Sequence, residues 1–313
     1  MLVIIGKVMS IFAIMLIGLV AYRVGVAGDD AVKPLTSILM NITCPCLVVY
    51  SLYSKEISGS LFGDTLAVMA GVMIFFAFAT VMTYIFLKVS KIGRKEDMGL
   101  IMVAVAATNS GFMGFPLVKS LYGSDMLYLM VMGNMMLNVY LMWIEPMILT
   151  IGNKSRVTAG DMLNAFKTPL VISLIVGFLM FFFHIRPTGE VDETIRMIGD
   201  VTVPLSMMLV GIRLGSVRIK EILSRENIVI SIFAMIVIPA IVFAILYPIG
   251  IISSDVKIII AITAALPSAV VAAVVAEQHS DNAILVSEIV SLTTLMSIIT
   301  VPAAAVLIET LYR

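Results

Sequence analysis

Residues 107–116 read Ala107-Thr108-Asn109-Ser110-Gly111-Phe112-Met113-Gly114-Phe115-Pro116, and they decide how the rest of the chain is built. This stretch lies inside a run, from about Met98 to Tyr122, that is otherwise apolar enough to span a bilayer. Glycine and proline weaken a helix interior, and lipid offers no hydrogen-bond partner to an asparagine amide. The stretch therefore predicts a transmembrane helix that is broken near the bilayer midplane, with its freed backbone groups facing a cavity. Broken helices at that depth are typical binding elements of secondary transporters.

The composition of the chain indicates a polytopic membrane protein. Of its 313 residues, 61% are hydrophobic and only 13% are charged, whereas soluble domains have roughly 45–50% apolar and about 25% charged residues. Mean hydropathy is +1.12. The formal net charge is zero, so the charge balance does not favour nucleic acid as a partner. The two cysteines, Cys44 and Cys46, are too few for a metal site, and we expect neither a metal nor a cofactor.

Hydrophobic runs of spanning length occur ten times along the chain, near 2–22, 34–53, 62–88, 98–122, 125–149, 168–185, 195–214, 227–249, 256–277 and 282–308. The distribution of Lys and Arg between the loops fits best when both termini are extracytoplasmic, because the inner loops then hold most of these residues. We expect a multi-pass protein of the plasma membrane, with the lipid bilayer as its surroundings.

The two halves of the chain match at one fixed offset. Aligning Pro45 with Pro204 also places Thr108-Asn109 over Pro267-Ser268 without a gap. Each half holds five spans, and an odd number reverses the second half in the membrane, which gives an inverted repeat. The predicted fold is therefore all-α, with ten transmembrane helices arranged as 1–150, a cytoplasmic loop over 151–167, and 168–313. We expect the break at Pro267 to meet the first break where the two spans cross.

The meeting point of the two breaks predicts a carboxylate site. Half-helices that begin near Ser110 and near Ser268 present unpaired N–H groups and the positive end of the helix dipole. Asn109 offers an amide donor to a carboxylate or an oxygen to a cation, and the alternative is that it only caps the break. The predicted substrate-binding set at the breaks is Thr108, Asn109, Ser110, Gly111, Pro267 and Ser268, and the residues expected to shape the backbone are Gly114, Pro116, Pro45 and Pro204.

Two further spans carry polar side chains at helical spacing. Asn134 and Asn138 are four residues apart and share one helix face, where they either bind substrate or hydrogen-bond a neighbouring helix. The last span carries a stripe of hydroxyls, Ser287, Ser291, Thr294 and Ser297. Such a stripe serves helix packing or substrate contact, and Ser291 is included in the predicted site.

Three acids are candidates for coupling to H⁺ or Na⁺. Asp200 and Asn41 occupy equivalent places before the paired prolines of the scaffold, whose face would border the substrate. Asp200 would carry a coupling proton, with its pKa raised by burial. The alternative is that each of the two residues caps a helix start or kink. Glu288 lies two turns inside its span, as a proton carrier, a cation ligand or an interfacial residue. Glu145 lies near an inner span end, where it would snorkel or pair with a loop cation.

The motif around the first break resembles the auxin efflux carrier family, including its bacterial malate-permease-like members. It reads Asn109-x-Gly111-x-x-Gly114-x-Pro116-Leu117 and is followed by Leu121-Tyr122-Gly123. The resemblance implies a bile-acid-transporter-like fold with two crossed broken helices, in which helices 1, 2, 6 and 7 form a scaffold and helices 3–5 and 8–10 a moving bundle. It also implies a homodimer and an elevator-type motion. Plant members carry a proline where this chain has Thr108, and a long loop where this chain has only 152–167.

The function expected from these features is a secondary transporter of small organic anions, such as malate-like dicarboxylates or auxin-like carboxylates. A channel or a membrane sensor built on the same fold is the alternative. An intramembrane enzyme is disfavoured, because it needs a catalytic pair in mid-span and both histidines, His184 and His279, lie at span ends.

Overall fold

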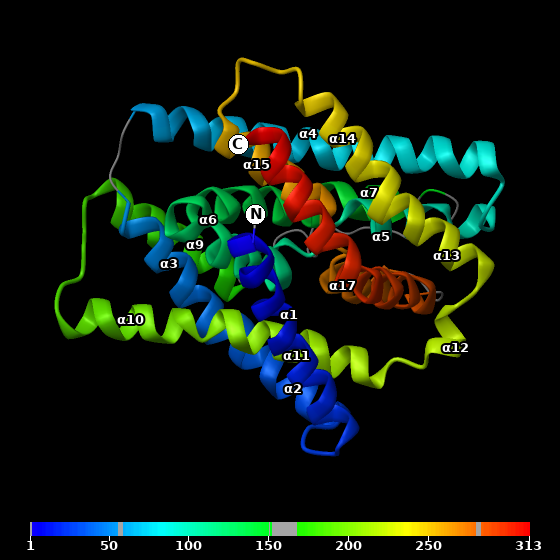
Figure 1. The fold of residues 1–313 in the computed structure, drawn as a ribbon, viewed down its shortest axis with the longest axis horizontal. Coiled ribbons are helices and arrows are strands. Elements are labelled where there is room, and N and C mark those ends of the chain that lie inside the picture. The colour runs from blue at the N-terminus through cyan, green and yellow to red at the C-terminus, as the bar shows by residue number, and fades with distance from the viewer. Residues whose placement is uncertain (1, 56–58, 150, 152–167, 280–282) are drawn as a thin grey trace. The chain divides into compact units, whose positions relative to one another are not determined.

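The computed structural model describes residues 2–55, 59–149, 151, 168–279 and 283–313. Within these residues the chain forms helices and a single isolated β-bridge, with no β-strand (Figure 1). Seven of the described helices are long and apolar enough to cross a membrane: Gly6–Arg23, Asp29–Tyr53, Leu61–Ser90, Ser110–Leu149, Glu190–Ser216, Arg225–Leu246 and Ile284–Tyr312. The all-helical class is confirmed, whereas the ten-span 5+5 repeat stays a prediction. The predicted loop 151–167, apart from Ile151, lies outside the described residues.

The chain divides into two compact units. Unit 1 consists of Met1–Gly63, Gly111–Val131 and Met162–Val217. Its elements are α1 (Leu2–Arg23), α2 (Asp29–Ile38), the π-helical turn η1 (Leu39–Thr43), α3 (Cys44–Tyr53), α9 (Pro169–Phe182), α10 (Glu190–Asp200), α11 (Thr202–Ser216) and the first part of α6 (Phe115–Val139). Helix α1 packs along α11, and α3 packs against α9 and α10 (Figure 1).

Glycines bring the backbones of α1 and α11 into direct contact. A Cβ added to Gly211 would lie 1.9 Å from the carbonyl oxygen of Met15, and one added to Gly18 would lie 2.1 Å from that of Met208. Small residues permit this close approach between membrane helices, where van der Waals packing replaces the hydrophobic effect as the main attraction. The pair of helices is therefore a tightly packed element of unit 1.

Two of the predicted backbone breaks lie at helix boundaries in unit 1. Pro45 follows the π-helical turn η1 and lies in the first turn of α3. Pro204 lies in the first turn of α11, shortly after α10 ends at Asp200. Proline fits the first turn of a helix because the N–H it lacks has no partner there. Both prolines therefore lie next to irregular points of the helix runs Asp29–Tyr53 and Glu190–Ser216.

Unit 2 consists of Asp64–Ser110, Met132–Asp161 and Arg218–Arg313. Its elements are α4 (Gly59–Ser90), the short 3₁₀ turn η2 (Lys95–Asp97), α5 (Met98–Ala106), the last part of α6, the π-helical turn η4 (Tyr140–Ile144), α7 (Glu145–Leu149), α12 (Ile219–Ile222), α13 (Arg225–Ile232), the π-helical turn η6 (Phe233–Val237), α14 (Ile238–Leu246), α15 (Ser254–Ala265), α16 (Val270–His279) and α17 (Ala283–Tyr312). Helix α17 packs against α5, α13, α15 and α16 and forms the centre of this unit.

The chain passes between the units through the π-helical turn η3 (Ser110–Gly114) and through α6. Gly123 interrupts α6 with φ +83°, a left-handed backbone conformation that favours glycine. The run of helix over Ser110–Leu149 is therefore bent at the place where the sequence predicts one span to end and the next to begin.

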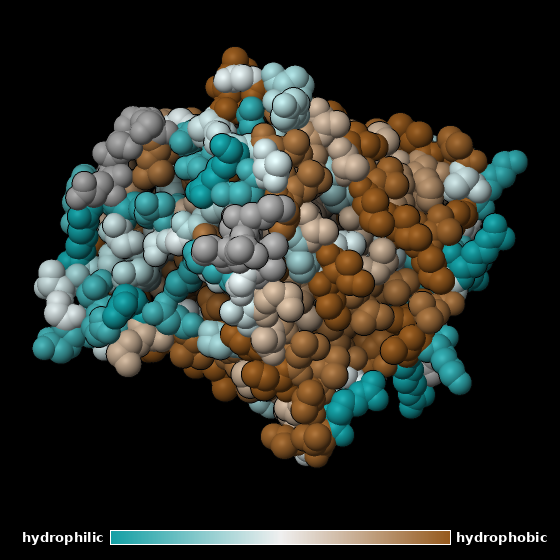
Figure 2. All heavy atoms as spheres, in the orientation of Figure 1, coloured by the Kyte–Doolittle hydropathy of each residue, from teal (hydrophilic) through white to brown (hydrophobic). Residues whose placement is uncertain are grey.

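Large apolar side chains are exposed along many of the helices. They include Ile74, Val89, Phe182 and Ile299, and brown apolar atoms cover much of the face shown in Figure 2. Exposed apolar surface on this scale is typical of helices that face lipid rather than water.

Candidate functional site

Two apolar helix runs are interrupted in their middle, one leading from α5 of unit 2 into segment 111–131 of unit 1 and the other from α15 to α16 within unit 2. Helix α5 ends at Ala106, the backbone at Ala107 is extended, and helical structure resumes at Ser110. Helix α15 ends at Ala265, the backbone at Leu266 is extended, and α16 begins at Val270. Both breaks predicted from the sequence are therefore present, and the second half-helix begins two residues after Ser268.

The two breaks pair with each other. Thr108 and Ser268 form an isolated antiparallel β-bridge. The Asn109 N–H donates to the Pro267 carbonyl at 2.7 Å, and the Ala269 N–H donates to the Ala107 carbonyl at 2.7 Å. Each interruption thus satisfies backbone groups that the other leaves open, which is the condition for irregular backbone at membrane depth.

The main-chain donors at the breaks are already used, which corrects one expectation. The Ser110 N–H donates to the Thr108 carbonyl at 2.8 Å, and the Ser268 N–H donates to the Thr293 hydroxyl oxygen at 3.2 Å. Together with the two donors in the bridge, four N–H groups at the breaks therefore have protein acceptors. The prediction that unpaired N–H groups of these residues hold the ligand is wrong for this conformation.

Two buried hydroxyls at the paired breaks have no hydrogen-bond partner among the described residues. Thr108 and Ser268 are each 3% exposed, and neither Thr108 Oγ1 nor Ser268 Oγ hydrogen-bonds any described residue. Leaving a buried hydroxyl without a partner costs about 1–3 kcal/mol. Both hydroxyls belong to the bridged residues, and Ser268 lies two residues before α16 begins at Val270, at the positive end of that helix dipole. Ligand oxygens at this point would therefore gain two hydrogen bonds that the protein does not supply.

The asparagines of the fifth predicted span are connected to the first break. The Ser110 hydroxyl donates to Asn134 Oδ1 at 2.6 Å, and both residues are buried. Asn138 Nδ2 donates to the Asn134 carbonyl at 3.1 Å, within the same helix. Asn109 is also buried, beside the bridge in sequence. The structure therefore brings Ser110 and Asn134 together, through the interhelical hydrogen bond that was the alternative to substrate binding.

The hydroxyl stripe of the last predicted span is satisfied within its own helix. Ser291, Thr294 and Ser297 donate to carbonyls one turn back in α17, at 2.8, 2.6 and 2.6 Å. The hydroxyl that reaches the break is instead Thr293, which accepts from the Ser268 N–H. Thr293 was not among the residues predicted from the sequence, although two consecutive threonines, Thr293 and Thr294, in an apolar span were a signal for it.

Two of the predicted coupling acids lie in unit 2. Glu145 is fully buried, and neither of its carboxylate oxygens hydrogen-bonds a described residue, so the expectation that it snorkels or pairs with a loop cation is wrong. Glu288 is half-buried and accepts from Asn227 Nδ2 at 2.9 Å. Asn227, itself buried, was not among the predicted residues.

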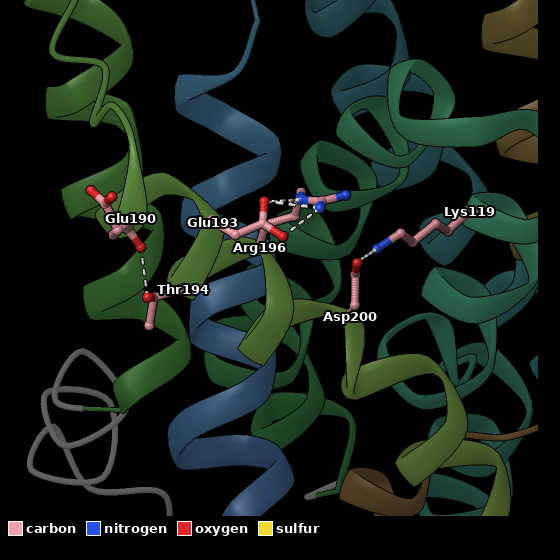
Figure 3. Close-up of polar contacts among 6 residues, drawn as sticks. All are labelled: Lys119, Glu190, Glu193, Thr194, Arg196 and Asp200. Atoms are coloured by element: carbon pink, nitrogen blue, oxygen red, sulfur yellow. Dashed lines mark hydrogen bonds and ion pairs between the residues drawn. The ribbon is translucent and has the colours of Figure 1, made fainter.

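The remaining coupling acid lies on the surface of unit 1. Asp200 forms an ion pair with Lys119 (Figure 3), and their side chains are 48% and 22% exposed. The condition of burial that a proton-carrying Asp200 required is therefore not met. Asn41 is exposed and donates to the Ser37 hydroxyl at 3.0 Å. The placement of Asn41 beside the substrate stays a prediction.

The segment 111–131 is held to the other parts of unit 1 by lysine contacts. Besides the pair between Lys119 and Asp200, Lys55 pairs with Asp125, and Lys7 Nζ donates to the Leu121 carbonyl at 3.1 Å. The resemblance places this segment in the moving bundle, whereas compactness groups it with unit 1.

Candidate metal ligands are scattered. In the part of the chain that the structure describes, no three His, Cys, Asp or Glu side chains lie together as a metal site would require. Cys44 is a buried free thiol and Cys46 a half-buried one. His184 is exposed, and the side chain of His279 lies outside the described residues.

The sequence is similar to those of membrane transport proteins. A family model described as "Membrane transport protein" matches residues 3–304. An uncharacterized transporter of Methanothermobacter thermautotrophicus is 24% identical over 304 residues, which cover 96% of this chain and 97% of that protein. An uncharacterized transporter of Methanocaldococcus jannaschii is 23% identical over 306 residues, covering 94% of this chain and 95% of that protein.

Proposed function

The chain belongs to the membrane transport protein family, that of the auxin efflux carriers, and we propose that it is a secondary carrier of small organic anions. The substrates that fit are malate-like dicarboxylates or auxin-like carboxylates. Its apolar helices and the family match make it a multi-pass membrane protein. We place it in the plasma membrane with both termini extracytoplasmic.

One observation carries the proposal. Two helix interruptions meet at an antiparallel bridge whose residues belong to unit 2, and the hydroxyls of the bridged residues, Thr108 and Ser268, are buried without a described partner. Discontinuous helices that meet in this way form the substrate sites of several transporter folds. These observations support a site whose backbone is already paired and whose two hydroxyls are left to hydrogen-bond a substrate.

A carboxylate suits this site because it only accepts hydrogen bonds. Hydroxyls of Thr108 and Ser268 would each donate to a carboxylate oxygen, and hydrogen bonds to a charged acceptor are roughly twice as strong as neutral ones. The positive end of the α16 dipole adds to the attraction without a buried Arg or Lys. Asn109 and Asn134, buried beside the bridge and linked to it through Ser110, would position the rest of the substrate.

The division into two compact units supports an elevator-type cycle. Unit 2 contains the whole pairing of the breaks, so it would carry the substrate, and unit 1, with its closely packed α1 and α11, would serve as the scaffold. The segment 111–131 would then remain with the scaffold in this conformation. A homodimer formed through the scaffold completes the proposal by family resemblance.

The test is counterflow of malate in proteoliposomes. Vesicles loaded with unlabelled malate should take up labelled malate in a saturable manner, and Thr108→Val combined with Ser268→Ala should abolish that uptake. Ser231→Ala is a matched control, because the Ser231 hydroxyl is also buried in unit 2 without a described partner but lies on α13. Unsaturable flux would favour the channel alternative, and undiminished counterflow in the double variant would place the site elsewhere.

A further inference from the structure

A buried acid without a partner lies at a helix irregularity in unit 2. Glu145 follows the π-helical turn η4 and is 0% exposed, and neither carboxylate oxygen hydrogen-bonds a described residue. It lies within the apolar helix run Ser110–Leu149. An ionised carboxylate that is buried alone in such a helix costs several kcal/mol. Neither the pairing of the breaks nor the packing of the unit requires an acid here.

The elements packed against Glu145 offer no described cation. Helix α7 contacts α5, which carries no charged residue, and α16. The charged residues of α16, Glu277 and His279, have side chains outside the described part of the chain. In the turn before Glu145, the Tyr140 hydroxyl lies 2.9 Å from that of Thr80 and is engaged there.

The surroundings suit a proton better than a metal cation. A Na⁺ or Ca²⁺ ion requires several oxygens that converge on it, whereas no described residue hydrogen-bonds either oxygen of the Glu145 carboxyl. A proton requires only the carboxyl itself. Pro146 follows directly and has no N–H, so the preceding π-helical turn lacks one helical donor and keeps a carbonyl that can accept a hydrogen bond.

We infer that Glu145 is a proton-binding site through which the carrier couples H⁺ to movement of its anion, an inference that rests on the proposed function. The proton passes from water on one side to a Glu145 carboxylate oxygen, forming one O–H bond, and that bond breaks when the proton is released to water on the other side. A bound carboxylate and an ionised Glu145 would place two negative charges in one apolar unit. Protonation removes one of them, so the proton and the anion move in the same direction.

The first test needs no substrate. Infrared spectra of the purified protein at neutral pH should show the C=O band of a protonated carboxylic acid, and Glu145→Gln should remove it. Glu145→Asp, which keeps the acid, should shift the band. A spectrum in which Glu145→Gln leaves every protonated-acid band unchanged would overturn the inference, whether or not malate is transported.

The second test separates coupling from binding. In proteoliposomes, an inward pH gradient should drive accumulation of labelled malate by the wild-type protein. Glu145→Gln should keep malate counterflow but accumulate no more malate with the gradient than without it. Glu288→Gln is the matched control, because that carboxylate already has a donor in Asn227, and it should behave like the wild type.

The remaining outcomes of these two tests distinguish failure of the proton site from failure of the proposed substrate class. Full gradient-driven accumulation by Glu145→Gln, or its loss in Glu288→Gln alone, would contradict the assignment of the proton to Glu145. Absence of malate counterflow in the wild type, together with a Glu145-dependent acid band, would refute the proposed substrate class and leave the proton site standing. Size-exclusion profiles and melting temperatures of each variant show that it is folded.

Discussion

Removing the two open hydroxyls should affect stability and binding in opposite ways. Thr108→Val and Ser268→Ala each delete a buried hydroxyl that has no described hydrogen-bond partner. Because no protein hydrogen bond is lost, the free energy of unfolding should stay unchanged or rise by about 1 kcal/mol per site. In the proposed complex each hydroxyl would donate to a charged carboxylate, which is worth about 1.5–3 kcal/mol. Since 1.4 kcal/mol is tenfold in Kd, each substitution should weaken malate binding roughly ten- to hundredfold.

The assay combines thermal unfolding in detergent with calorimetric titration of malate. Thr293→Val is the internal contrast, because it deletes the hydroxyl oxygen that accepts from the Ser268 N–H. That change leaves a buried main-chain donor unpaired and should destabilise the protein by about 1–3 kcal/mol. Thr202→Val, at another buried hydroxyl without a described partner but in unit 1, should leave malate binding unchanged. The reasoning is refuted if Thr108→Val destabilises as much as Thr293→Val, or if it binds malate as tightly as the wild type.

Three further outcomes are expected. Gly211→Ala would place a Cβ 1.9 Å from the Met15 carbonyl oxygen and should destabilise the protein by about 1–3 kcal/mol in thermal unfolding, whereas Gly63→Ala, with no atom within 4 Å of its added Cβ, should not. Pro267→Ala restores an N–H at the second break and should lower the malate transport rate about tenfold, or about 1.4 kcal/mol, with a smaller effect on Kd. Lys119→Met breaks a partly exposed ion pair and should lower the free energy of unfolding by less than about 1 kcal/mol in a denaturant titration.

The breaks were predictable because their signals are local. Asn, Gly and Pro in an apolar run conflict with a continuous membrane helix whatever packs against it, and both α5 and α15 end where those residues begin. The weak match between the halves of the chain placed Thr108-Asn109 over Pro267-Ser268, the residues that the structure pairs. Pro45 and Pro204 lie next to irregular points of two helix runs, Asp29–Tyr53 and Glu190–Ser216.

Contacts between distant residues were not predictable from pattern. Helical spacing selected Thr294 for the polar stripe, whereas the rotation of α17 brings Thr293 to the break. The pairing of Asn227 with Glu288 joins residues 61 apart, and no periodicity reports such a contact. Likewise, the distance of Glu145 from the span end suggested access to solvent, whereas packing of α7 against α5 and α16 buries it.

Tertiary pairing also decides which backbone N–H groups at the breaks remain without an acceptor. A single break leaves N–H groups open, and the sequence analysis assigned them to the ligand. Two breaks that pair as an antiparallel bridge satisfy the N–H groups of Asn109 and Ala269, whereas the hydroxyls of the bridged Thr108 and Ser268 keep no described partner. This outcome depends on the register of one segment against the other, which residue types alone do not set.

A structure determined at saturating malate tests the central claim most directly. The account predicts a carboxylate whose oxygens lie within hydrogen-bonding distance of Thr108 Oγ1 and Ser268 Oγ, with the bridge between the two breaks intact. Malate bound elsewhere, with both hydroxyls still without partners, would contradict it.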